Sequence, residues 1–192
     1  FQNPTGALMP DDNKKRLLAL ARRHGVTVIE DDVFGDLHYG SERPTPLKAW
    51  DRDGDVIYCA SFTKSFAPSF RLGWLAAGRH TETALLHKLM NTLSTSIPNQ
   101  MAVASYLRDS RPDRRLARLR DTLASNRARL ADTVRRHFPA GSEVNTPAGG
   151  FFLWVTLPPE CDTLAHYPKA LAAGVSFVPG ALFSPSGRFG HC

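Results

Sequence analysis

Apolar and polar positions along the first half of the chain follow the patterns of helices and short strands. A helix is predicted from Pro10 to about His24, because its apolar side chains fall on one face: Leu17, Leu18, Leu20 and Ala21. Short apolar runs predict strands over residues 26–29, 56–60 and 72–77, and the β-branched composition of the first favours a buried parallel strand. Helices that alternate with strands in this way indicate an α/β fold.

Beyond Gly78 the pattern changes to consecutive helices followed by a smaller α+β unit. Helices are predicted over residues 79–91, 98–106 and 108–137. Two further strands, at residues 151–157 and 175–178, flank a helix that ends at Ala173. We expect the boundary between the two units near residues 139–142, at the end of the long helix.

The composition is that of a globular chain, with 192 residues, 42% hydrophobic content and no long apolar run. No membrane span and no signal peptide is visible, so we expect a cytoplasmic protein. The three cysteines are widely spaced and in no metal-ligand pattern, which predicts reduced thiols and no structural metal. Because the first residue is Phe1 rather than Met, the chain is expected to be cut from a longer protein.

The net charge of +6 belongs to one predicted helix. Residues 108–137 contain ten arginines and four aspartates, so the rest of the chain balances at fourteen basic and fourteen acidic residues. The same helix has an apolar stripe: Leu116, Leu119, Leu123, Leu130 and Val134. We interpret the arginines as the solvated face of a packing helix rather than a DNA-reading helix, because no DNA-binding motif accompanies them.

The segment from Ser61 to Arg71 carries the strongest chemical signature. Lys64 lies between Ser, Thr and Phe residues and precedes a loop with Pro68, a composition that favours neither helix nor strand. A deprotonated lysine amine forms a Schiff base with a carbonyl group, and Arg71 with the hydroxyls of Ser61 and Thr63 can bind a phosphate. An aldehyde and a phosphate on one molecule suggest pyridoxal phosphate. The alternative is a surface loop with a solvated lysine and arginine.

Acidic residues follow the first predicted strand, at Glu30, Asp31 and Asp32. Open α/β sheets bind their ligands at the carboxyl ends of strands, where a carboxylate can keep a heteroaromatic ring nitrogen protonated. A helix cap or a loop hydrogen bond is the alternative interpretation of this aspartate pair. The second strand leads directly into the Lys64 segment and the third follows Arg71. Polar residues therefore gather at strand ends, which favours a binding site.

The order and spacing of these motifs resemble the fold-type-I, class I/II aminotransferases, which use pyridoxal phosphate. Asn3-Pro4-Thr5-Gly6 is similar to the family's NPTG turn, and Asp31 is similar to its strand-end aspartate. Residues 61–64 with Arg71 are similar to its cofactor-lysine signature. The resemblance covers essentially the whole chain. It implies part of a large cofactor-binding domain with a mostly parallel sheet, over residues 1–140, followed by part of a smaller α+β domain, over residues 141–192.

The resemblance also implies a role for each matched residue. Lys64 would form the internal aldimine, Asp31 would pair with the pyridinium nitrogen, and Asn3 would hydrogen-bond the ring hydroxyl oxygen. The phosphate would be bound by a cation and hydroxyls: Arg71, Ser61 and, more weakly, Thr63. The family's glycine-containing phosphate loop and ring-stacking aromatic would precede this chain, and its substrate-carboxylate arginine would follow it. The site would be completed across a homodimer.

Within the family, the sequence of residues 29–37 and 46–51 is most similar to MocR-type regulators, which fuse a winged-helix domain of the GntR kind to an aminotransferase-like domain. Three functions follow from this resemblance. The protein is a regulator that senses an amino acid or amine through Lys64, a stand-alone aminotransferase, or an inactive fragment. In the first case DNA would be bound only through a domain absent from this chain.

Phe34 stands where many family members have a tyrosine that shares the ring oxygen with Asn3. Loss of this hydroxyl donor should raise the aldimine pKa, because the deprotonated form loses a hydrogen bond. We expect a higher aldimine pKa in the complete protein than in its Phe34→Tyr variant, measured by spectrophotometric pH titration. Equal values would contradict the idea. Tyr39 is an alternative source of the hydroxyl.

Overall fold

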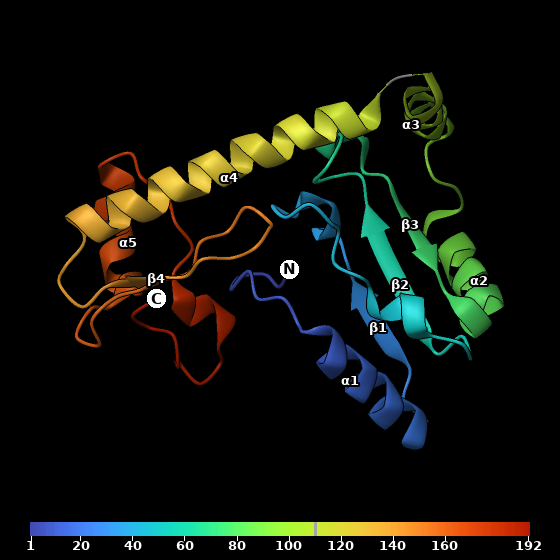
Figure 1. Cartoon of the computed structure of the whole chain (residues 1–192), viewed down its shortest axis with the longest axis horizontal. Coiled ribbons are helices and arrows are strands. Elements are labelled where there is room, and N and C mark those ends of the chain that lie inside the picture. Colours follow the sequence, from blue (N-terminus) through green and yellow to red (C-terminus); the bar gives the residue numbers. More distant parts are fainter. Residues whose placement is uncertain (110) are drawn as a thin grey trace.

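The computed structural model describes residues 1–109 and 111–192. Its larger sheet has the strand order β1-β2-β3 (Figure 1). β1 (Val28–Asp31) runs parallel to β2 (Val56–Ser61), whereas β3 (Gly73–Ala76) runs antiparallel to β2. This arrangement confirms the predicted α/β class.

α1 (Asp11–Arg23) covers one face of this sheet. Acidic residues occupy its first turn and basic residues its last, which suits the helix dipole. Leu18 of α1 packs in one buried cluster with Leu47 and with Val56 of β2, while Val28 and Trp50 pack against the cluster. Burial of each such leucine or valine stabilises the fold by about 2 kcal/mol. The first predicted helix is therefore confirmed.

The opposite face of the sheet is open in this chain. Side chains alternate along a strand, so Ile29 and Leu75 point away from the side on which Val28 and Val56 are covered. Ile29 is 70% exposed and Leu75 is 49% exposed. The prediction of a buried first strand is thus wrong for this chain, because β1 has a strand neighbour on one edge and a helix on one face only.

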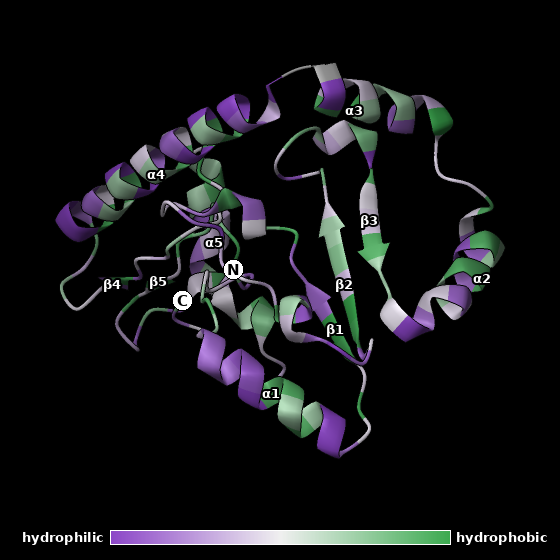
Figure 2. Cartoon of the chain, turned by 45° about the vertical axis from the view of Figure 1, so that its right-hand side comes forward, coloured by the Kyte–Doolittle hydropathy of each residue, from purple (hydrophilic) through white to green (hydrophobic). Residues whose placement is uncertain are grey.

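Three helices follow the sheet and lead to a second, smaller sheet: α2 (Thr81–Thr92), α3 (Ile97–Asp109) and α4 (Pro112–His137). α4 crosses the molecule from α3 to this second sheet, in which β4 (Glu143–Val144) pairs antiparallel with β5 (Val155–Thr156) (Figure 1). α5 (Thr163–Ala172) comes next. α2 carries apolar residues, which are green in Figure 2, and Met90 among them is 76% exposed.

Short 3-10 helices join these elements: Gly35–Leu37, Leu47–Trp50, Pro68–Phe70, Gly78–His80 and Gly180–Phe183. None of the described helices is long and apolar enough to cross a bilayer.

Two predicted strands of the C-terminal part need correction. Only residues 155–156 of the predicted strand 151–157 lie in the described strand ladder, because β4 offers just two residues. Residues 175–178 form no strand. The Val175 amide donates to the Ala170 carbonyl and so belongs to the C-terminal end of α5. The next backbone amide along the chain with a described backbone partner is that of Gly180, which donates to the Cys192 carbonyl. Val178 is correspondingly exposed.

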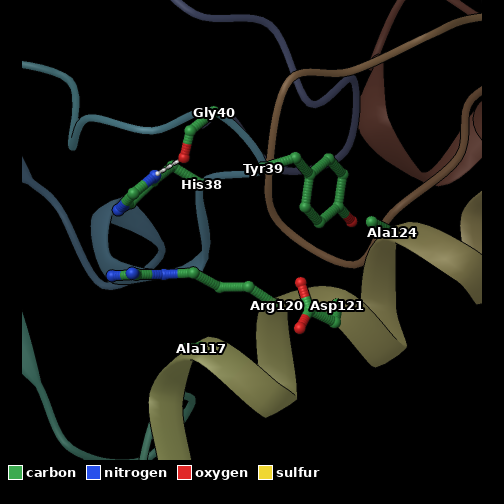
Figure 3. A pocket seen from close by; sticks show the side chains of 7 residues that line it. All are labelled: His38, Tyr39, Gly40, Ala117, Arg120, Asp121 and Ala124. Atoms are coloured by element: carbon green, nitrogen blue, oxygen red, sulfur yellow. Dashed lines mark hydrogen bonds between the residues drawn. The ribbon is translucent and has the colours of Figure 1, made fainter. Parts of the chain in front are cut away.

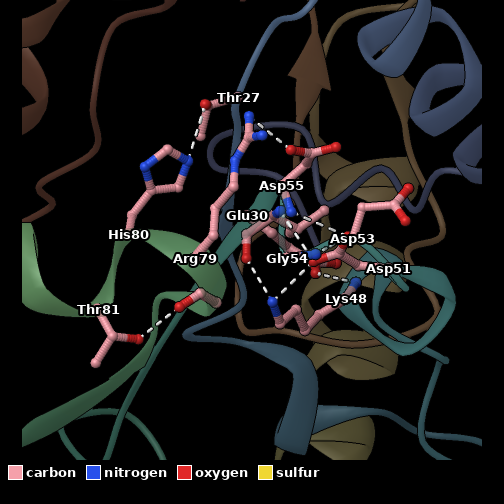
Figure 4. A network of polar contacts seen from close by, with 12 residues as sticks. Thr27, Glu30, Lys48, Asp51, Asp53, Gly54, Asp55, Arg79, His80 and Thr81 are labelled. Carbon is pink, nitrogen blue, oxygen red and sulfur yellow. Dashed lines mark hydrogen bonds and ion pairs between the residues drawn. The ribbon is translucent and has the colours of Figure 1, made fainter.

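A polar network fixes the segment that connects β1 to β2 (Figure 4). Glu30 of β1 accepts hydrogen bonds from the Leu47 and Lys48 amides at 2.6 and 2.8 Å. Lys48 Nζ donates to Asp51 Oδ2 at 2.8 Å and to the Val56 carbonyl at 2.7 Å. The Asp51 carboxylate also accepts from three backbone amides, those of Gly54, Asp55 and Val56. These bonds hold the start of β2 in place beside β1.

The same network shifts the ionisation of Asp51, whose side chain is fully buried. Burial by itself raises the pKa of Asp51, but the hydrogen bonds from Lys48 and from the Val56 and Asp55 amides outweigh it and lower the pKa to about 2. Because the folded pKa lies below the unfolded one, the stabilisation is complete above pH of about 4 and is lost as the pH falls through about 2.

We expect the Asp51→Asn variant to lower the free energy of unfolding by about 2 kcal/mol at pH 7, since it removes this charge-dependent stabilisation. Its stability should also fall less steeply than that of the wild type between pH 4 and pH 2. Urea unfolding at several pH values measures both effects. The matched control is Asp53→Asn, whose side chain is 60% exposed and pairs only with Arg22. Equal effects of the two substitutions would contradict the assignment.

Candidate active site

The register of the sheet places three polar side chains on its open face. Asp31, the last residue of β1, lies opposite Cys59 of β2, and Ser61 ends β2 two residues further on, opposite Gly73. Residues two apart on a strand project from the same face about 7 Å apart. Asp31, Cys59 and Ser61 therefore share one face at the carboxyl ends of two parallel strands. Burial and the Asp31 carboxylate both raise the pKa of the Cys59 thiol.

The two neighbouring aspartates have different partners. Asp32 Oδ2 accepts from Arg43 Nη2 at 2.6 Å and from the Tyr58 hydroxyl at 2.8 Å. Burial and the hydrogen bond to Asp32 raise the pKa of Tyr58 to about 12, so this hydroxyl stays a donor. Asp31 is exposed, accepts from the Val33 amide at 3.3 Å and forms no ion pair within the described chain. Of the two carboxylates, that of Asp31 is the one available to a ligand.

The Lys64 segment is a closed loop between β2 and β3. The Phe62 amide donates to the Leu72 carbonyl at 3.0 Å across its base. Ser61 Oγ donates to Thr63 Oγ1 at 2.9 Å and accepts from the Thr63 amide at 3.0 Å. The two hydroxyls that were predicted to bind a phosphate thus lie in contact, in a side-chain turn that begins the loop.

Lys64 lies beside aromatic rings rather than acidic residues. Its Nζ is 5.9 Å from the ring centroid of Phe34 and 5.5 Å from that of Phe151, distances at which a cation interacts with an aromatic face. The two rings pack edge to face at 5.4 Å. Lys64 forms no salt bridge with any carboxylate of the described side chains, so its amine remains available for chemistry.

Arg71 ends the loop in an unusual backbone conformation. Its φ of 51° is in the left-handed region, shared among described non-glycine residues only by Leu93. This conformation costs a residue with a side chain about 1 kcal/mol. Its exposed guanidinium has no ion pair in the described chain. Such backbone strain concentrates at functional sites, which supports the hypothesis that Arg71 binds a ligand.

The N-terminal turn lies against the C-terminal part of the chain. Asn145 Nδ2 donates to the Thr5 carbonyl at 2.5 Å. A Cβ at Gly149 would overlap the Phe1 ring, so only glycine permits this close packing. Asn3 is exposed, and within the described residues no hydrogen bond joins it to Lys64 or Asp31. The proposed role of Asn3 therefore stays a prediction.

Of two pockets in the described chain, one includes a candidate site residue. The larger, of about 420 Å³, is lined by Asp31, Gln2 and Ile29 among others. The smaller, of about 170 Å³, lies between α4 and residues 38–40, as Figure 3 shows, and Lys64 lines neither. Burial lowers the pKa of His38 in the smaller pocket. The Tyr39 hydroxyl donates to the Gly150 carbonyl at 2.5 Å, so it is already bonded within the chain.

Several residues of this arrangement were not predicted. Phe151 follows two glycines and was assigned only to a strand, yet it lies against Lys64. Arg43 and Tyr58 hold Asp32, although no local motif marks them. Arg115 of α4 donates to the Ser65 and Phe66 carbonyls and was interpreted as part of a solvated face. These contacts connect segments that are separated along the chain or arise from a helix with many arginines, so no local pattern indicated them.

The fold and the site together define a class of protein, that of the aminotransferases. LysN, an α-aminoadipate aminotransferase from Thermus thermophilus complexed with N-(5'-phosphopyridoxyl)-L-leucine, superposes with a TM-score of 0.91 and 31% identity, over 99% of this chain and 50% of that one. The multiple substrate aminotransferase from Thermococcus profundus gives a TM-score of 0.90 and 32% identity, over 99% and 47%.

Residues 1–189 match the family described as aminotransferase class I and II, and the chain belongs to this family. This confirms the predicted family and pyridoxal phosphate as its cofactor. The chain is 42% identical to YdcR of Escherichia coli K12, described as an uncharacterized HTH-type transcriptional regulator, over 95% of its length. It is 36% identical to aromatic-amino-acid aminotransferase 1 of Thermococcus litoralis, again over 95%. These matches cover 39% and 44% of the two relatives, less than half of each.

The different partners of the two aspartates predict different effects of their loss. We expect Asp32→Ala to lower the free energy of unfolding by about 2 to 3 kcal/mol, because it breaks charge-assisted hydrogen bonds to Arg43 and Tyr58. The Asp32 side chain is only 14% exposed, so the partners that lose it are poorly solvated. Asp31→Ala should change it by less than about 0.5 kcal/mol. Urea unfolding of both variants measures the difference. A comparable loss for Asp31→Ala would show that this carboxylate has a structural role.

Proposed function

We propose that this chain is part of the pyridoxal-phosphate domain of a MocR-type transcriptional regulator, and that the domain senses an amino acid or amine. The observation that carries the cofactor part of the proposal is Lys64, whose amine lies against two aromatic rings at the end of a parallel strand, without an acidic partner in the described chain. The 42% identity to an HTH-type regulator, against 36% to an aminotransferase, supports the regulatory part.

The donor set of the site fits pyridoxal phosphate. The cofactor presents an aldehyde, a ring nitrogen and a phosphate dianion. The chain offers an amine at Lys64, a carboxylate at Asp31, a guanidinium at Arg71 and the paired hydroxyls of Ser61 and Thr63. None of the three charged groups forms an ion pair in the described chain, whereas neighbouring Asp32 and Arg43 do. These free groups are of the kinds that a carbonyl, a ring nitrogen and a phosphate require.

When bound, the cofactor supplies a carbonyl group and an electron-accepting ring. In this proposal Asp31 holds a proton on the ring nitrogen through its negative charge, and Arg71 with Ser61 and Thr63 anchors the phosphate. Lys64 would hold the cofactor's carbonyl group through its amine, and when released it could hold a proton close to an amino compound. Asn3 would hydrogen-bond the ring oxygen.

We further propose that the site is completed by additional polypeptide and by a second copy in a cytoplasmic homodimer. Large exposed apolar side chains support this, since Ile29 on the open sheet face is 70% exposed and Leu93, directly after α2, is 78% exposed. Exposed apolar side chains that gather in patches normally mark an interface. In a regulator, a separate winged-helix domain would bind DNA.

A stand-alone aminotransferase is the second candidate, favoured by the aminotransferase similarity of 36% and by structural neighbours that are aminotransferases. In that case Lys64 would move the α-proton of an amino acid whose amino group passes to a 2-oxo acid. Assays of DNA binding and transamination on the full-length protein distinguish the two functions. Amine-dependent DNA binding without turnover supports a regulator, whereas transamination without DNA binding supports an enzyme.

Borohydride reduction of the full-length protein with pyridoxal phosphate tests the part that both candidates share. We expect a stable adduct on the peptide that contains Lys64, identified by mass spectrometry, and its complete loss in Lys64→Ala. The matched control is Lys88→Ala, which removes another exposed lysine, on α2, and should retain the adduct. A wild-type protein without an adduct would favour the inactive fragment, and an adduct retained in Lys64→Ala would place the reactive amine elsewhere.

A further inference from the structure

Three arginines of α4 bond to the backbone of the segments that carry the candidate site. Arg115 donates from Nη1 to the Ser65 carbonyl at 3.3 Å and from Nη2 to the Phe66 carbonyl at 3.0 Å. Arg120 donates from Nε to the Asp36 carbonyl at 2.7 Å. Arg127 donates from Nη1 to the Pro147 carbonyl at 2.7 Å. The three acceptor segments are the Lys64 loop, the loop after Asp31 and the segment before Phe151.

The contacts of Arg115 are the most direct. Ser65 and Phe66 are the two residues after Lys64, and the planar guanidinium reaches both carbonyls with its two terminal nitrogens. The same guanidinium stacks on the Phe66 ring at 5.2 Å from its centroid. Phe66 in turn packs on Tyr106 of α3 at 4.3 Å. The loop that presents Lys64 is thus held from outside by two helices.

Arg120 and Arg127 act on the other two segments in the same way. Arg120 bonds to the backbone carbonyl of Asp36, and the carboxylate of the same residue accepts a hydrogen bond from Arg43. Arg43 also donates to Asp32, the residue after Asp31. The Arg127 guanidinium lies 5.0 Å from the ring centroid of Tyr39, whose hydroxyl donates to the Gly150 carbonyl just before Phe151. Thirteen residues of one helix, from Arg115 to Arg127 and spanning about 18 Å, therefore connect all three segments.

From this geometry we infer that Arg115, Arg120 and Arg127 are positioning residues, which set Lys64, Asp31 and Phe151 in fixed relation through contacts of α4 with backbone carbonyls. The inference rests on the proposed function, because it assigns these contacts a purpose in cofactor binding. It also divides the arginines of α4 into two groups. Arg114 and Arg118 are exposed, and their side chains form no hydrogen bond, ion pair or ring contact in the described chain, so they remain a solvated face.

The test compares Arg115→Ala with Arg118→Ala in the full-length protein. We expect Arg115→Ala to raise the Kd for pyridoxal phosphate by about threefold or more, since it removes charge-assisted hydrogen bonds at an exposed position. The pH midpoint of the bound cofactor's absorbance should also shift, because the amine moves relative to its surroundings. Arg118→Ala should leave both values unchanged. The Kd and pH midpoint of Arg115→Lys should lie between those of the wild type and Arg115→Ala. A lysine keeps the positive charge, but its ammonium lacks the planar pair of donors that reaches both carbonyls.

Hydrogen–deuterium exchange of the cofactor-free protein gives a readout that does not depend on cofactor binding. Amides inside the loop, such as those of Phe66 and Ala67, which donate to the Phe62 carbonyl, should exchange faster in Arg115→Ala than in Arg118→Ala. Faster exchange together with the altered Kd and midpoint supports the inference. Unchanged exchange overturns it, even if the wild type fails to bind the cofactor and the proposed function falls. Faster exchange with an unchanged Kd and midpoint also overturns it, because Arg115 would then be merely structural.

Discussion

The parallel pairing of β1 with β2 is the constraint on which the candidate site depends. In its register Asp31 lies opposite Cys59, so two strand ends meet at one edge of the sheet and Ser61 follows on the same face. A shift by a single residue would turn Asp31 toward the face that α1 covers and would present Asp32 instead. The polar network of Glu30, Lys48 and Asp51 fixes the connection between these strands, and so stabilises that register.

Asp31 and Asp32 have different surroundings because successive side chains at a strand end point to opposite faces of the sheet. Asp32 turns toward Arg43 and Tyr58, where low exposure strengthens its hydrogen bonds, and it stabilises the chain there. Asp31 turns toward the open face and has only a long bond to the Val33 amide. One aspartate is thus bound within the fold while the other remains available, although local sequence does not distinguish them.

Sequence patterns predicted what depends on near neighbours. The helix of residues 11–23, the strands of the larger sheet and the loop around Lys64 follow from local periodicity and from residue types that favour loops. Patterns failed where pairing decided the outcome. Residues 175–178 include two valines and a phenylalanine, yet they form no strand because no described strand lies beside them. The aromatic surroundings of Lys64 could not be predicted either, since Phe34 and Phe151 lie far from it in the chain.

The three charged residues proposed to hold the cofactor lack the surroundings that would make such groups reactive. Lys64, Asp31 and Arg71 are all exposed, and charges in water interact weakly because the solvent screens them. Covering the open sheet face would exclude water and strengthen each of their interactions with a cofactor. The exposed apolar side chains of that face, Ile29 and Leu75, would provide the free energy for such covering. The charged groups are exposed because this face is uncovered. The apolar side chains of the same face would favour a covering segment, which would then bury the charged groups.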